Sequence, residues 1–348
     1  MSKAKAKPSP SAPVRAPEPP STASGAANVS NANKNLADQV AGPASAQGGR
    51  MDVGGAQVAE SSEAGGYYCE HTLFSTLEAS SKPGSSVVQG QDGALAGFLH
   101  VPDDEATYSR DPVADQAQRH EQTRRVVGAA LRGYFDQISL QGGVADGDPF
   151  RILVTGYGSF MDEIRNNPTG DFVAHEENLT AAMQQAFGAA LVGGPEQVNV
   201  QQTDRFLERA RQGGGAEVQE YYTATWRYRV EEPATLGVRD VLVTALRLPV
   251  TDQAIDPASP GSVQDAMAEF GPQAVLSMGV VPDRDFSEHT YRAETRADDQ
   301  NLATDQERRR HEPGQAPTAE RASRGLASAI RSGSASLSNA NRERAASP

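Results

Sequence analysis

The sequence predicts an α/β protein with helices on both faces of a sheet. Compact apolar runs typical of buried strands alternate with segments that repeat apolar residues at helical spacing. All aromatic residues lie between Tyr67 and Tyr291, and no internal repeat is visible. These observations predict a three-layer α/β/α sandwich around a mixed sheet.

The distribution of aromatic residues sets the expected domain limits. Because aromatic side chains supply much of the area that a core buries, one folded domain is expected over residues 55–310. Residues 1–54 are rich in Pro, Ala and Ser, and such a segment buries too little surface to offset the entropy lost on ordering. Residues 311–348 are expected to be mostly disordered, apart from a short helix at 325–332.

Hydrophobic periodicity places the elements inside this domain. The clearest helix is expected over residues 113–138, where Val127, Leu131 and Tyr134 recur at 3.6-residue spacing. Further helices are expected at 70–79, 176–191, 202–212 and 261–270. Buried strands are expected at 56–60, 94–102, 151–156, 221–230, 240–250 and 273–280.

Charge and hydropathy argue against two classes of partner. The formal net charge is −13, and no basic block is large enough to follow a phosphate backbone. No apolar run approaches the about 18 residues that a membrane span needs. Lys3, Lys5 and Lys7 lead into prolines instead of the apolar segment of a signal peptide. We therefore expect a cytoplasmic protein that binds neither nucleic acid nor membrane.

Metal and cofactor motifs are missing from the sequence. Cys69 is the only cysteine, which excludes an intrachain disulfide and a Cys-rich zinc site. The six histidines show no HExxH spacing. The loop GYGSF after the strand at 151–156 lacks the third glycine of a dinucleotide site and the Gly-Lys-Ser/Thr ending of a P-loop. Neither a metal nor a cofactor is expected.

Cys69 stands where a thiol can be made reactive. Gly65 and Gly66 permit a tight turn just before it, and a helix is expected to begin at Glu70. The positive end of the helix dipole and the free backbone N–H groups would stabilise a thiolate there. The same N–H groups could form an oxyanion hole. On these grounds Cys69 is a candidate nucleophile, with a buried, inert cysteine as the alternative.

A thiol nucleophile needs a general base, and two histidines are candidates. His100 ends the strand at 94–102, where loops of α/β folds gather functional groups. His71 follows Cys69 by two residues and would leave the helix on a different face, so His100 is favoured. Tyr157 and Phe160 suggest a wall for a small flat ring, with plain core packing as the alternative.

At these residues the chain resembles the pyroglutamyl peptidase type I family, the pyrrolidone-carboxylate peptidases. AGGYYCEHTLF at 64–74 is similar to the family's nucleophile segment, and GFLHVP at 97–102 to the strand that carries its catalytic histidine. The family's first strand, its aromatic pocket loop and the segments ahead of its catalytic glutamate resemble RILVTGYGSF at 151–160, NNPTG at 166–170, RLPV at 247–250, PQAVLSMG at 272–279 and DRDFSEHTYRAE at 283–294.

The order of these segments implies a circular permutation. The family runs pocket loop, glutamate, cysteine and histidine, whereas here the cysteine and histidine come first. Termini of compact domains often lie close together, so old ends can be joined and new ends opened in a loop. Residues 139–149 would be the joint, and residues 179–240 a larger insertion than the family carries. The resemblance thus implies a permuted, phosphorylase/hydrolase-like sandwich.

The resemblance also implies a role for each matching residue. Cys69 would be the nucleophile, His100 its general base and acid, and Glu288 the carboxylate that orients His100. The glutamate loop aligns with a two-residue gap, and without that gap Thr290 takes the carboxylate's place. Members of the family are commonly oligomeric, which implies a homo-oligomer.

The substrate side of the site is also implied by the resemblance. Tyr157 and Phe160 would flank a pyrrolidone ring, and Val280 replaces the glutamine beside the lactam. The expected activity is removal of N-terminal pyroglutamyl residues, or cleavage of a related cyclic amide, through a thioester. Two alternatives are a fold relative that has lost this activity and serves as a binding module, and an enzyme of nucleoside-phosphorylase-like architecture.

Overall fold

The chain divides into two units, Met1–Pro43 and Ala44–Pro348. The computed structural model describes only residues of the second unit. These are residues 50–61, 68–81, 94–102, 112–140, 144, 147–158, 167–201, 207–210, 216–219, 222–232, 237–250, 254, 259–281, 290–294, 296–298, 320–322 and 325–346.

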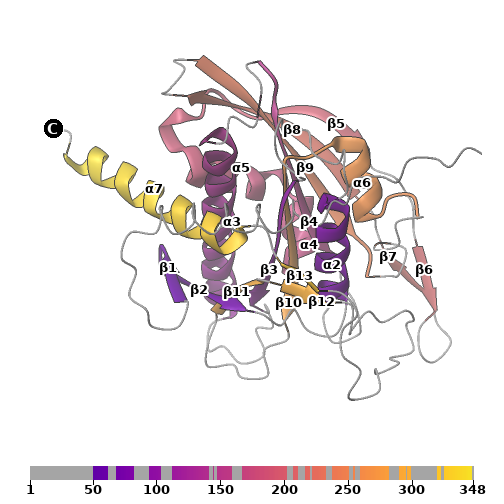
Figure 1. Cartoon of the computed structure of the whole chain (residues 1–348). Helices are drawn as coiled ribbons and strands as arrows, with labels where there is room; N and C mark the ends of the chain where they lie inside the picture. The colour runs from indigo at the N-terminus through magenta and orange to yellow at the C-terminus, as the bar shows by residue number, and fades with distance from the viewer. Residues whose placement is uncertain are drawn as a thin grey trace, which may run out of the picture. The chain divides into compact units, whose positions relative to one another are not determined.

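A nine-stranded mixed sheet is the centre of the described residues (Figure 1). In sheet order its strands are β1 (Arg50–Val53), β2 (Ala56–Ser61), β11 (Thr290–Glu294), β3 (Leu95–Pro102), β10 (Ala274–Val281), β4 (Phe150–Tyr157), β9 (Gly237–Leu248), β8 (Tyr222–Glu232) and β5 (Glu196–Gln201). The central strands β3, β10, β4 and β9 run parallel. On either side, β11 and β8 run antiparallel to them.

Six α-helices of the described residues flank this sheet. They are α2 (Tyr68–Ser81), α3 (Pro112–Leu140), α4 (Pro168–Ala174), α5 (Glu176–Phe187), α6 (Val263–Phe270) and α7 (Leu326–Ala346). A 3₁₀ turn, η2 (Gly188–Ala190), follows α5. Two small antiparallel sheets are separate from the nine-stranded sheet. One pairs β6 (Leu207–Ala210) with β7 (Ala216–Gln219), and the other pairs β12 (Arg296–Asp298) with β13 (Glu320–Ala322). The predicted α/β class is confirmed.

Side chains of the parallel strands alternate between two separate cores, as the period of a strand requires. On β4, Ile152 and Val154 belong to the core that includes α3, α5 and α7, whereas Leu153 belongs to the core that includes α2 and α6. Figure 1 shows α3 and α2 on opposite sides of the central strands. We call the first the α3 face and the second the α2 face of the sheet.

Helix α7 packs on α3 through small residues on both helices. A Cβ added to Gly133 of α3 would lie 1.9 Å from the carbonyl oxygen of Ala329, and one added to Gly333 of α7 would lie 2.0 Å from that of Ala129. The two backbones therefore touch. This contact orders a segment for which the sequence predicted only a short helix at 325–332, because Leu326 and Ile330 become part of the main core.

Most expected elements are found within a few residues of their predicted ends, with two differences. Residues 207–210, inside the helix expected at 202–212, form strand β6, because pairing with β7 outweighs local helix propensity. The fold also extends beyond the expected limits of 55–310, since β1 begins at Arg50 and α7 ends at Ala346. Within residues 179–240, β5 and β8 lengthen the main sheet.

Candidate active site

Cys69 lies in the first turn of α2 and is partly exposed. Its sulfur lies against the backbone of the sheet, because a Cβ added to Gly279 of β10 would be only 2.7 Å from Sγ. The same Cβ would lie 2.7 Å from Cζ of Phe98. The missing side chain of Gly279 therefore makes the space that the thiol occupies.

His100 lies beside this glycine on the neighbouring strand. In the parallel pairing of β10 with β3, Gly279 is the register partner of His100. Ala96 and Phe98 of β3 belong to the core on the α2 face, so alternation directs His100 to the same face. The predicted nucleophile and the predicted base thus lie at the same row of the sheet, one from a helix and one from a strand.

The partner of His100 is Glu294, the last residue of β11. Nδ1 of His100 lies 2.7 Å from Oε1 of Glu294, and only 2% of His100 and 1% of Glu294 are exposed. A hydrogen bond donated from Nδ1 of His100 to Glu294 would leave Nε2 for another group. Cysteine, histidine and carboxylate are the residue types of a thiol-hydrolase triad.

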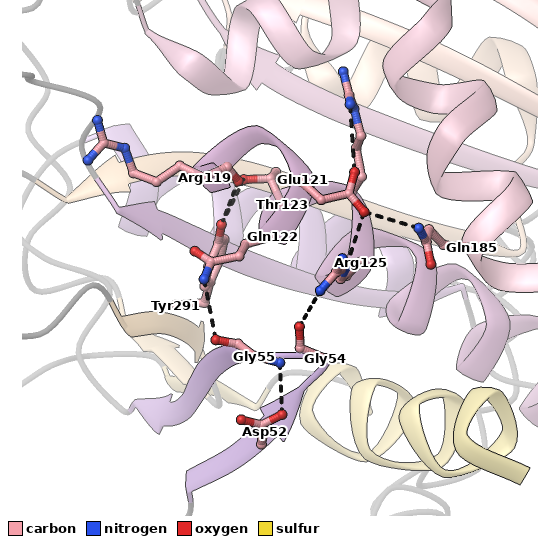
Figure 2. Close-up of polar contacts among 11 residues, drawn as sticks. Asp52, Gly54, Gly55, Arg119, Glu121, Gln122, Thr123, Arg125, Gln185 and Tyr291 are labelled. Carbon is pink, nitrogen blue, oxygen red and sulfur yellow. Dashed lines mark hydrogen bonds and ion pairs between the residues drawn. The ribbon is translucent and has the colours of Figure 1, made fainter. Parts of the chain in front are cut away.

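Strand β11 is held in place from the α3 face. Figure 2 shows Tyr291 reaching α3, where its hydroxyl lies 2.8 Å from Oγ1 of Thr123 and donates to the carbonyl oxygen of Arg119 at 3.2 Å. Tyr291 and Ala293 belong to the core on that face. Alternation then directs Arg292 and Glu294 to the α2 face, toward the row that holds His100.

The hairpin of β1 and β2 supports the same strand from its other edge. Gln122 of α3 donates to the carbonyl oxygen of Gly55 at 3.3 Å, and Arg125 donates to that of Gly54 (Figure 2). Within the hairpin turn, Asp52 accepts a hydrogen bond from the Gly55 N–H at 2.9 Å. Because β2 pairs in parallel with β11, these contacts also brace the strand that carries Glu294.

The other predicted site residues lie on β4, β10 and α2, or outside the described residues. Tyr157 is buried, and its hydroxyl is hydrogen-bonded to Thr72 on α2, so the ring lies under the nucleophile's helix. Val280 is also buried, and alternation along β10 directs it to the α3 face, away from Cys69. Phe160 and Glu288 lie outside the described residues. His71 is partly exposed on α2.

Two residues that lie beside Cys69 or His100 were not predicted from the sequence, Glu294 and Gly279. Glu294 sits at the end of a short strand where local pattern gives a carboxylate no reason to be buried. Gly279 could have been noticed, because a glycine at the carboxyl end of a buried strand often marks a close approach of another group.

Two other features are absent from the described part of the chain, a metal-binding cluster and a membrane-spanning helix. No group of three or more His, Cys, Asp or Glu side chains there could hold a metal ion. None of the described helices is long and apolar enough to cross a membrane.

No family model, no curated protein and no solved structure matches this chain.

Proposed function

We propose that this protein is a cysteine-type amidohydrolase with Cys69 as nucleophile, His100 as general base and acid, and Glu294 as the residue that orients His100. One observation carries the proposal. His100, buried against Glu294, is the register partner of Gly279, the glycine on which the sulfur of Cys69 rests. Burying a polar histidine and a carboxylate opposes folding unless each has a partner, and here each is the other's partner.

The proposed substrate is an N-terminal pyroglutamyl residue or a related cyclic amide. It is supported by the resemblance of the cysteine and histidine segments to the pyroglutamyl peptidases. The proposal includes the family's three-layer sandwich in circularly permuted order, with Tyr157 and Phe160 near the ring. Glu294 replaces Glu288 in the proposed triad, because it is the carboxylate in contact with His100.

The reaction would proceed in two balanced steps. The Cys69 thiolate attacks the carbonyl carbon, the C–S bond forms, and the C–N bond breaks as His100 delivers a proton to the leaving amine. Water then attacks the thioester, giving its proton to His100, and the thiolate leaves with the carboxylic acid as product. Backbone N–H groups at the start of α2 would stabilise the oxyanion in both steps.

A second candidate is a binding module that has lost the activity. The observation that favours it is Val280, which replaces a polar lactam contact and faces away from the thiol. Retention of a complete Cys, His and Glu set favours the hydrolase.

The test is release of fluorophore from a pyroglutamyl-coumarin amide by the full chain. Cys69→Ser should abolish turnover, and circular dichroism should show that the variant is folded. No turnover by folded wild-type protein, together with alkylation of Cys69 no faster than that of a free thiol, would favour the binding module.

A further inference from the structure

Arg292 is a second charged residue on the α2 face of β11. Its neighbours Tyr291 and Ala293 are both fully buried in the core on the α3 face. Arg292 and Glu294 therefore project from the opposite side of the strand. Glu294 is buried against His100, whereas Arg292 is partly exposed.

The register of the sheet places Arg292 directly opposite His100. In the antiparallel pairing of β11 with β3, these two residues are Cα partners. Cβ atoms of directly opposite residues lie about 4.5–5.5 Å apart. One row across the α2 face thus contains Arg292, His100 and Gly279, and Cys69 lies over the last of them.

The guanidinium of Arg292 has no partner inside the described part of the chain. It makes no ion pair or hydrogen bond there, whereas Arg239 is paired with Glu232 and Arg331 with Glu60. The acid nearest to it on its own strand face, Glu294, is engaged by His100. A cation without an acid is notable in a chain whose formal net charge is −13.

A free guanidinium opposite the proposed general base is suited to one class of ligand. Its planar fork of N–H donors matches the two oxygens of a carboxylate, and charge-assisted pairs of this kind are among the strongest hydrogen bonds in proteins. A side chain of this length, starting opposite His100, can reach a group attached close to the bond that Cys69 attacks.

We propose that Arg292 binds a carboxylate beside the reacting thiol, and that the protein therefore acts on amides whose leaving amine carries a free carboxylate. Resting on the proposed function, this names pyroglutamyl amino acids as the preferred substrate class, cleaved more efficiently than the corresponding neutral amides. Arg292 is a specificity-determining residue in this scheme, and Cys69, His100 and Glu294 supply the chemistry.

The experiment has one arm that needs no turnover. Cys69 is the only cysteine, so its alkylation by anionic iodoacetate and by neutral iodoacetamide can be followed in the full chain. Arg292→Gln should slow iodoacetate about 10- to 100-fold, the range that a hydrogen bond to a charged group covers, and iodoacetamide much less. Arg292→Lys should give an intermediate rate.

The control is Arg229→Gln, which removes the same charge from an exposed position of β8 and should change neither rate. Equal slowing of both reagents by Arg292→Gln, or slowing of iodoacetate by Arg229→Gln to the same extent, would overturn the assignment of Arg292.

The second arm compares hydrolysis of pyroglutamyl-alanine with that of pyroglutamyl-alanine amide. Arg292→Gln should raise KM for the acid about 10-fold or more, with little change for the amide. Loss of both activities in equal measure would contradict a carboxylate site. If wild-type protein cleaves neither compound but alkylation still depends on Arg292, the pyroglutamyl activity fails and the anion site stands.

Discussion

Nδ1 of His100 lies 2.7 Å from Oε1 of Glu294, and the two residues are 194 positions apart in the sequence. Both side chains are closed off from solvent, so each depends on the other for a partner. With Nδ1 of the imidazole engaged by Glu294, Nε2 is the ring nitrogen that remains for another group.

Glu294→Gln should lower kcat for a pyroglutamyl amide about 100-fold or more, with a smaller change in KM. An amide can donate to Nδ1 and hold the wrong tautomer, and a comparable change in a serine protease triad lowers kcat by about 10⁴-fold. Steady-state kinetics with the coumarin amide would measure both constants. Glu288→Gln is the matched control, and a larger effect of that change would return the triad role to Glu288.

Gly279→Ala should slow the reaction of Cys69 with iodoacetamide about 10-fold or more. The added methyl group would lie 2.7 Å from both Sγ and the Phe98 ring, so the thiol or the ring must move. Mass spectrometry of the alkylated chain would give the rate. Gly194→Ala, where no atom lies within 4 Å of the added Cβ, should behave as wild type. An unchanged rate in Gly279→Ala would mean that the thiol of Cys69 does not lie against β10.

Gly133→Ala should reduce the free energy of unfolding by about 1–3 kcal/mol. The new Cβ would be 1.9 Å from a backbone oxygen of α7, which cannot turn away as a flexible side chain would. Ala favours a helix over Gly by about 1 kcal/mol, so a net loss of stability would show that the helix contact outweighs propensity. Urea unfolding would measure it, and Gly333→Ala should act in the same direction. A stabilised Gly133→Ala protein would mean that α7 does not pack here.

Tyr134→Phe should not reduce stability at neutral pH, and could increase it by up to about 1 kcal/mol. The Tyr134 hydroxyl is buried with no hydrogen-bond partner among the described residues, and such a group is costly. Tyr228→Phe is the contrasting control, since that hydroxyl lies 3.0 Å from Oγ1 of Thr180. Its loss should cost about 1 kcal/mol. Urea unfolding at pH 7 compares the two, and the reverse ranking would contradict the prediction.

The same tyrosine should make wild-type stability fall in alkali. Burial raises the pKa of Tyr134 above its usual value, whereas the unfolded chain ionises near its ordinary pKa of about 10. Ionisation of Tyr134 therefore leaves the free energy of unfolding unchanged below about pH 10. Above that value the unfolded chain loses this proton more readily than the folded chain, so the free energy of unfolding falls as the pH rises. Tyr134→Phe should flatten the decline in urea midpoint between about pH 9 and 11, and an unchanged slope would assign it to other groups.

Sequence reasoning succeeded where the signal is local. Residues 113–138 repeat apolar side chains at helical spacing, and the structure has α3 over Pro112–Leu140. The apolar run at 94–102 became β3, and His100 stands at its carboxyl end as expected. Residues 207–210 were predicted to be helical but form strand β6, because pairing with β7, and not their own propensity, decides their conformation.

The sequence by itself determined the α/β class and the main helices and strands, and it singled out Cys69 and His100 as candidate site residues, because hydrophobic period and glycine punctuation act over a few residues. Only the tertiary structure decided that Glu294 meets His100, that Gly279 makes room for the thiol, and that Arg292 stands in the same row. These relationships depend on the pairing of β11 with β3 and of β3 with β10. Strand pairing joins distant segments through backbone hydrogen bonds, which carry no residue-specific signal in the sequence.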